Sequence, residues 1–274
     1  MIKNVFRHAF VVSVLSVFLI AQANISMATS WNGIDVNIVS YSLSNPNPFA
    51  QIVGSSLRLT DGVDEAAAAW AVTPVSTTNS FTTTFSFSLV NPFVVYTPTP
   101  PALPFVLPMA DGIALAFQSA SNTALGNGGA SLGAGGISNI AGSAVQTWSN
   151  NRLGLFQGDP SDLINTHINP APFDLGNADS VTGIETVSYD ALTHFLSMTG
   201  NVNGNPVSDS LGINLFELYG STMYVGFTGG SGLGGSVQDI TGWDGINATG
   251  VPEPATMLLL GLGLVGLAGV RRKF

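Results

Sequence analysis

Residues 81–89 alternate strictly between two kinds of side chain, and this alternation constrains the fold more than any other feature of the chain. One set consists of Phe81, Thr83, Phe85, Phe87 and Leu89, and the residues between them are all Thr or Ser. Because successive side chains of a β-strand point to opposite faces, the pattern places the large apolar residues on one face of a strand. The same period recurs in residues 113–117, 187–189, 195–198 and 223–227. Short strands separated by Gly, Asn and Pro clusters predict an all-β fold, an antiparallel two-sheet sandwich.

Residues 64–69 form the one helix-like run, Asp-Glu followed by four Ala. We interpret this run as a bulged or turn-rich approach to a strand that begins at Trp70. The chain is rich in Gly, Ser, Thr and Asn, as disordered secreted polymers are, but the period-two segments argue against disorder. With Cys 0, the chain has no disulfide, no thiol nucleophile and no cysteine metal site. The roughly 220 residues between its ends are enough for one all-β domain.

The N-terminal end of the chain is typical of a targeting segment. Lys3 and Arg7 precede an apolar run over residues 9–21, and small-x-small sites then allow cleavage after Ala23 or Ala28. A basic start, a short apolar run and a small-residue cleavage site together indicate a secretory signal peptide. We therefore predict a signal peptide at residues 1–28.

The C-terminal end combines a motif, an apolar stretch and a basic stop. Pro252, Glu253 and Pro254 precede an apolar run over residues 257–270, which Arg-Arg-Lys-Phe closes. This order resembles the PEP-CTERM sorting signal of Gram-negative bacteria, in which an exosortase recognises the motif and cleaves the tail. The 14 apolar residues span about 21 Å as a helix, against about 30 Å for a hydrocarbon core. A plain C-terminal membrane anchor is the alternative.

These two ends predict an exported domain at residues 29–250 and a sorting or anchor segment at 251–274. The domain then lies in the cell envelope or extracellular matrix of a Gram-negative bacterium, with membrane contact only through the C-terminal segment. Its cations are Arg58 and Arg152 alone, against 15 acids, a net charge of about −13. So acidic a domain does not bind nucleic acid, because that affinity comes largely from Lys and Arg on phosphates. Neutral glycans and cations remain as ligands.

Residues suited to binding a small sugar follow one another between positions 110 and 151. On a β-scaffold, a sugar needs a carboxylate for its hydroxyl groups, a backbone N–H left accessible by glycine, and an amide side chain. Asp111, Gly135 or Gly136, and Asn150 can supply these three groups. The alternatives are ordinary Asp-Gly turn chemistry and a flexible loop, because further glycines between residues 126 and 133 crowd the same segment.

Taken with their flanks, these residues resemble the legume-type (L-type) lectins. In that family an aspartate after a cis Ala-Asp bond, a glycine-loop N–H and a metal-braced asparagine hold the sugar. The resemblance spans about residues 31–245, and its later motifs are Tyr189-Asp190-Ala191, Tyr224-Val225-Gly226-Phe227 and Trp243. It implies a concanavalin-like, two-sheet antiparallel jelly-roll sandwich that binds a glycan or extracellular polysaccharide through Asp111, Gly135 or Gly136, and Asn150. Asn151 is the alternative to Asn150 in a shifted register.

The metal region departs from this family. L-type lectins commonly carry Glu-x-Asp just before a Thr-aromatic pair, and alignment of Thr147-Trp148 leaves Ala144 and Gln146 at those places. The resemblance implies that the remaining ligands are Trp148, Asn150, Asp159 and His167, with Asp162 as an alternative to Asp159. Hard cations favour charged oxygen ligands, and a transition metal favours carboxylates beside its imidazole. A calcium site therefore stays open at reduced charge, and a transition-metal site is not expected.

Two other functions compete with sugar binding. A glycoside hydrolase on a similar jelly roll needs paired carboxylates across a groove. The glutamates of the domain, Glu65, Glu185 and Glu217, each lack a second acid at the i, i+2 strand spacing, so we predict that the protein is not an enzyme. The main alternative is a structural matrix protein that keeps the fold, has a degenerate metal site and binds no sugar. The primary prediction is an exported lectin-like protein trimmed by an exosortase-type protease.

Overall fold

The computed structural model describes residues 24–25, 28–43, 49–91, 95–96, 105–106, 108–148, 152–162, 169–170, 175 and 178–249. Within these residues the chain forms two large β-sheets that pack face to face and one separate two-stranded pair, and every strand pairing among them is antiparallel. The predicted two-sheet antiparallel sandwich is therefore confirmed. In the parts described, no helix is long and apolar enough to cross a bilayer.

The first sheet has the strand order β1-β3-β6-β18-β11-β12-β13-β14, with β2 paired to β3 and β7 paired to β18. Its strands are β1 (Asn24–Ile25), β2 (Thr29–Trp31), β3 (Ile34–Ser42), β6 (Glu65–Ala71), β7 (Val75–Ser76), β11 (Gly112–Gln118), β12 (Ala141–Gln146), β13 (Arg152–Gln157), β14 (Asn169–Pro170) and β18 (Thr222–Gly230). This sheet carries the segment around Asp111, which precedes β11.

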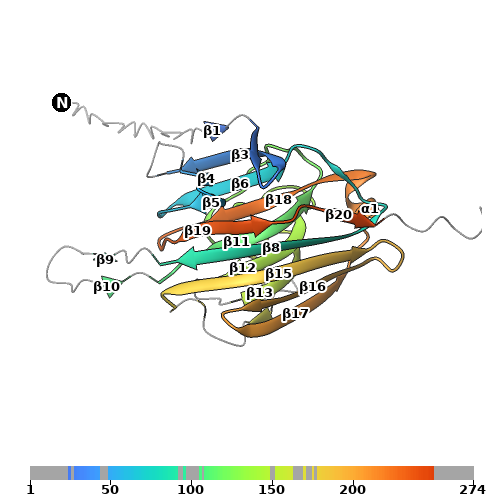
Figure 1. The fold of residues 1–274 in the computed structure, drawn as a ribbon. Coiled ribbons are helices and arrows are strands. Elements are labelled where there is room, and N and C mark those ends of the chain that lie inside the picture. The colour runs from blue at the N-terminus through green and yellow to red at the C-terminus, as the bar shows by residue number, and fades with distance from the viewer. Residues whose placement is uncertain are drawn as a thin grey trace, which may run out of the picture.

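The second sheet has the order β17-β16-β15-β8-β19-β5-β4, with β20 paired to β8. Its strands are β4 (Gln51–Val53), β5 (Ser56–Thr60), β8 (Ser80–Val90), β15 (Ser180–Asp190), β16 (Phe195–Val202), β17 (Asn205–Gly212), β19 (Val237–Trp243) and β20 (Asn247–Thr249). The remaining elements are the pair β9 (Val95–Tyr96) and β10 (Phe105–Val106), the 3-10 turn η1 (Gly129–Ser131) and the helix α1 (Leu215–Tyr219). Figure 1 shows β8, β15 and β19 of this sheet in front of β11, β12 and β13 of the first sheet.

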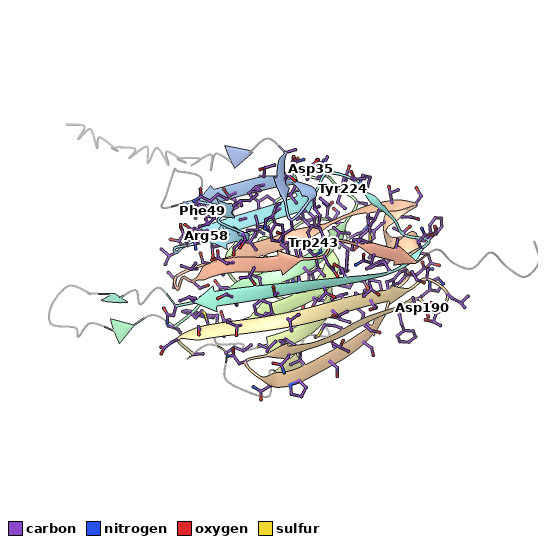
Figure 2. The ribbon with its side chains drawn as sticks, viewed as in Figure 1. Asp35, Phe49, Arg58, Asp190, Tyr224 and Trp243 are labelled. Atoms are coloured by element: carbon purple, nitrogen blue, oxygen red, sulfur yellow. The ribbon has the colours of Figure 1, made fainter. Side chains whose placement is uncertain are left out.

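Strand β8 lies between β15 and β19 in the second sheet, and its side chains alternate between buried and half-buried positions. The buried set is the one that the sequence predicts, including Thr83, which is polar. Thr83 Oγ1 accepts a hydrogen bond from Trp243 Nε1 at 2.8 Å, so its hydroxyl group satisfies the indole N–H inside the core. Trp243, labelled in Figure 2, also packs against Trp31 and Phe227, with ring centroids 6.2 and 5.2 Å away. These contacts join the two sheets.

Strand β6 corrects the interpretation of the alanine run. The strand begins at Glu65 rather than at Trp70, and it pairs with β3 on one side and with β18 on the other. Every residue of β6 is buried, so no alternation of polar and apolar residues marks it as a strand. Asp64, directly before it, has a positive φ of 56°, which ends the preceding turn. A strand that is covered on both faces has a continuous apolar sequence. The alanine side chains of β6 are small, so the layers on both faces can pack close to the strand.

The outer face of the first sheet is covered by a second, smaller hydrophobic core. Ala68, Trp70 and Ala114 on the sheet pack with Leu132 and Ala134 from the loop that follows β11. Trp70 Nε1 also donates to Ala124 O at 2.7 Å. This core holds the glycine-rich loop of residues 126–137 against the sheet, beside the start of β11.

Candidate functional site

Asp111 lies where the chain enters β11, and the Ala110–Asp111 peptide bond is cis, as the resemblance implies. Its backbone is fixed on both sides: Asp111 N donates to Gly230 O at 2.9 Å, and Thr147 N donates to Asp111 O at 2.8 Å. The residue is 6% exposed. Asp111 is therefore held at the end of the first sheet, between β18 and β12.

Two side chains of the β19 region hold the residue before Asp111. Ser236 Oγ donates to Ala110 O at 2.8 Å, and Gln238 Nε2 donates to the same oxygen at 3.3 Å and to Gly230 O at 2.9 Å. Sequence reasoning missed both residues, because each is an ordinary polar residue in a strand context. Their role follows from the packing of the second sheet behind the site.

The carboxyl group of Asp111 is mostly removed from water, and this burial raises its pKa to about 6, although the Gly232 N–H donates to it and favours the charged form. The residue after Asp111 must be a glycine for a steric reason. Gly112 has φ 136°, and a Cβ there would collide with the carbonyl oxygen of Val145 on β12. The Ala-Asp-Gly motif thus combines an acid with the close approach of a neighbouring strand.

The structure places different glycines beside Asp111 from those predicted. A Cβ on Gly232 would lie 3.2 Å from Asp111 Oδ2, and one on Gly129 would lie 3.9 Å from it. Gly135 packs on Asp159 instead, and its N–H donates to Ser131 O at 3.1 Å. Gly136 is exposed with φ 85°. The sequence has no signal that ranks the Gly128-Gly129 pair above Gly135-Gly136, since both lie in one loop.

A small depression of about 150 Å³ opens next to Asp111, between the glycine-rich loop and the loop after β18. It is lined by Tyr41, Leu43, Asp64, Glu65, Gly128, Gly129, Ser231 and Gly232. Backbone hydrogen bonds join its walls: Gly129 N donates to Ser231 O at 3.2 Å, Ser231 N to Glu65 O at 2.8 Å, and Asp64 N to Gly232 O at 2.9 Å. The walls of this depression are thus preformed.

Glu65, whose backbone contributes to this wall, also carries a buried carboxyl group. Its Oε2 accepts the N–H groups of Asp61 and Gly62 at 2.8 and 2.9 Å. Burial raises its pKa to about 7, and the two N–H groups oppose that shift. The residues that line the depression therefore include two acids, Asp64 and Glu65, and no cation.

Trp148 is half-buried, and its ring packs against Gly234 in the loop after β18. A Cβ on Gly234 would lie 2.6 Å from Trp148 Cζ3 and 2.9 Å from Ala110 Cβ, so glycine at 234 allows the ring to approach the site. Asn150 and His167, the other predicted ligands on this side, lie outside the described residues, as does Asn151. The structure therefore places Trp148 next to the Asp111 segment and leaves the roles of Asn150 and His167 as predictions.

The residues where the family carries metal-binding carboxylates do not fit such a site. Ala144 is buried in the second core, and Gln146 points its amide nitrogen at two carbonyl oxygens, Ala130 O at 2.9 Å and Pro160 O at 3.0 Å. Asp159 accepts hydrogen bonds from Ser131 Oγ at 3.2 Å and from Ser161 N and Oγ at 2.9 and 2.8 Å. Over the described ranges, no group of three or more His, Asp or Glu side chains comes together in a metal-ligating arrangement.

Comparisons with known proteins found matches for the C-terminal segment and for the β-sandwich. The PEP-CTERM protein-sorting motif model matches residues 250–273, which lie outside the described residues and include Pro252, Glu253 and Pro254. Three lectins of known structure are similar over nearly their whole length. Peanut lectin with a nine-residue peptide has a TM-score of 0.63 at 17% identity and covers 85% of this chain and 99% of its own.

The lectin from Bauhinia forficata in complex with GalNAc has a TM-score of 0.61 at 17% identity, with 85% of this chain and 100% of that chain covered. Basic winged bean lectin with Tn-antigen has a TM-score of 0.59 at 20% identity, with 81% and 96% covered. Identities this low show the fold alone. This chain has the legume-lectin jelly-roll fold together with a PEP-CTERM sorting motif, which indicates an exported bacterial protein.

Proposed function

We propose that this protein is an exported, non-enzymatic lectin-like protein that binds a neutral glycan or extracellular polysaccharide at Asp111. The observation that carries the proposal is the buried Asp111 carboxyl group, which lies beside Gly129 and Gly232 in the wall of a preformed depression of about 150 Å³. The similar lectins from Bauhinia forficata and winged bean were solved with GalNAc and Tn-antigen, which are sugar ligands of those proteins. Their shared fold supports a sugar as the ligand class here.

The groups around Asp111 suggest how a sugar ring is held. The ionised carboxylate accepts hydrogen bonds from two neighbouring hydroxyl groups, and charge-assisted bonds of this kind are the strong ones. Gly129 and Gly232 leave room beside the carboxylate, because neither carries a side chain that would fill the depression. Asn150, or Asn151, supplies an amide contact, and Gly135 or Gly136 supplies a backbone contact from the glycine-rich loop. The excess of acids in residues 29–250 favours a neutral glycan over a polyanion.

The sorting motif supports a place for this binding. The mature domain, residues 29–250, is released from its signal peptide and trimmed at Pro252-Glu253-Pro254 by an exosortase-type protease of a Gram-negative bacterium. Membrane contact is limited to the segment 251–274. The protein then acts in the cell envelope or in the exopolysaccharide matrix.

The proposal is tested by binding of the purified protein to a panel of glycans and exopolysaccharides. Asp111→Asn keeps the shape of the side chain but removes its charge. Because hydrogen bonds to a charged group contribute about 1.5–3 kcal/mol, the variant should bind about 10- to 100-fold more weakly. Asp35→Asn, an exposed aspartate on β3 that is labelled in Figure 2, is the matched control and should bind like the wild type.

The second candidate function is a structural matrix protein that binds no sugar, and it is favoured by the loss of the family's carboxylates at Ala144 and Gln146. A folded wild-type protein that binds nothing on the panel would support this candidate and overturn the lectin proposal. Selective binding that Asp111→Asn leaves unchanged would keep a lectin but place its site elsewhere.

A further inference from the structure

Gln146 occupies the junction of three segments that surround the candidate sugar site. It is the last residue of β12, is 2% exposed, and pairs with Gly112 across the sheet. Its Nε2 donates to Ala130 O in the glycine-rich loop at 2.9 Å and to Pro160 O in the loop after β13 at 3.0 Å. One buried amide group therefore joins two loops that are 30 residues apart in the chain to the end of a strand.

The two acceptors determine which way this amide points. Both neighbours are carbonyl oxygens, which cannot donate, so the nitrogen must face them. Gln146 Oε1 has no hydrogen-bond partner among the described residues. A divalent cation in the same position would use these two carbonyl oxygens as ligands, and the Gln146 amide nitrogen takes that place instead. The side chain that the alignment places at a metal-binding carboxylate is thus a hydrogen-bond donor to the loops.

Two side-chain contacts and the packing of one glycine also join the same two loops. Ser131 Oγ donates to Asp159 Oδ2 at 3.2 Å and lies 3.3 Å from Ser161 Oγ, while Ser161 itself binds Asp159 Oδ1. Gly135 packs against this pair, because a Cβ there would collide with the Asp159 carboxylate. The Asp159 carboxylate is thereby satisfied by hydroxyl and N–H donors of the protein.

The junction is coupled to the sugar site through short backbone connections. Thr147, the residue after Gln146, donates its N–H to Asp111 O at 2.8 Å. Gly129, which lies beside the Asp111 carboxylate, directly precedes Ala130, whose carbonyl oxygen Gln146 holds. A loosened Gln146 contact would therefore change the positions of Gly129, in the wall of the depression, and of Asp111 beside it.

We propose that Gln146 is a positioning residue that holds the glycine-rich loop and the loop of residues 158–162 in place of a divalent cation, so that the site is organised without calcium. The consequence for sugar affinity rests on the proposed function, whereas the bracing of the loops does not.

The bracing is tested on the full chain by hydrogen exchange of residues 126–137, measured in calcium and in chelator without any sugar. Wild-type protection of this loop should be the same in both buffers. Gln146→Ala should speed its exchange by a factor on the order of ten or more, because a buried two-fold donor is lost. Gln118→Ala is the matched control: this buried glutamine, at the other end of β11, binds residues 120 and 121, and its loss should leave 126–137 protected.

A second variant separates the donor function of Gln146 from its volume. Gln146→Glu keeps the size of the side chain but turns its oxygens toward two carbonyl oxygens, so in chelator the loop should exchange as fast as in Gln146→Ala. Full protection in Gln146→Glu would overturn the proposal. So would wild-type protection that falls in chelator and returns with calcium, because a cation would then be the brace. An empty glycan panel would refute sugar binding alone and leave these loop measurements unaffected.

Discussion

At the scale of single residues, the most unusual group away from the site is Glu185. Its side chain is fully buried between the sheets on β15, where Oε2 accepts a hydrogen bond from Ser143 Oγ on β12 at 2.8 Å. Its Oε1 has no partner among the described residues. Burial raises the pKa of this carboxyl group to about 7, although the Ser143 hydroxyl group favours the charged form. The sandwich thus contains an acid whose burial costs much less free energy when its carboxyl group is neutral than when it is ionised.

We predict that Glu185→Gln stabilises the protein at pH 8 and has little effect at pH 5. Above pH 7 the native glutamate must ionise inside the core, and a pKa raised from 4.5 to about 7 corresponds to roughly 3 kcal/mol of lost stability. The amide stays neutral, so a gain of about 2 kcal/mol in the free energy of unfolding at pH 8 is expected. Urea unfolding at the two pH values measures it, and an equal effect at both would contradict the assigned cause.

At the scale of elements, strand β6 shows how a run of alanines becomes a central strand. Its two faces meet different partners: Ala67 and Ala69 face the core between the sheets, and Ala68 faces the second core under the glycine-rich loop. Small side chains on both faces let the loop approach the sheet closely. Strand β6 therefore contributes to the core between the sheets and also positions one wall of the candidate site.

We predict that Ala68→Leu destabilises the protein by about 1–3 kcal/mol, because extra methyl groups in a close-packed core force its neighbours apart. The displaced neighbours include Leu132 and Ala134, so hydrogen exchange in residues 126–137 should also rise. Ala248→Leu on β20 is the matched control, since Ala248 is exposed in a strand, and it should change stability by less than about 0.5 kcal/mol. Equal effects of the two variants in thermal unfolding would show that the second core does not constrain β6.

At the scale of the whole molecule, the domain at residues 29–250 has many more acidic than basic residues, and several of its acids are buried. Glu65, Asp111 and Glu185 all have raised pKa values, of about 7, 6 and 7. Arg58 forms an ion pair with Asp239 at 2.9 Å, and its position on β5 is labelled in Figure 2. The acids between the two ends of the chain therefore repel one another with little compensation at neutral pH.

We predict that the protein is more stable at pH 5 than at pH 8. A carboxyl group whose folded pKa is raised keeps a proton that the unfolded chain releases, so the free energy of unfolding falls as the pH rises from about 4 to above 7. Thermal unfolding midpoints across this range check the direction. A midpoint that rises steadily toward pH 8 would mean that these three carboxyl groups are not buried in the folded protein.

The extent to which the site was predictable differs between its residues. The cis peptide bond before Asp111 is what the resemblance to L-type lectins implies, and the structure places Trp148 beside this segment. The sequence predicts Gly135 or Gly136 as the binding glycine, whereas the structure places Gly129 beside the Asp111 carboxyl group, because a glycine pair carries no mark of the carboxylate that it approaches. The donor role of Gln146 was also missed, since an amide can serve as donor or acceptor until its neighbours are known.

What the sequence by itself determined was the local geometry. Period two in residues 81–89 selects strand and face, because the strand backbone alone sets that alternation. The PEP-CTERM motif is likewise readable from contiguous residues. Only the tertiary structure decided that the alanines of β6 form a strand, that Gly129 and Gly232 flank Asp111, and that Gln146 joins two loops. The physical reason is that burial on both faces, close approach and amide orientation depend on segments distant in the chain, which leave no local periodicity behind.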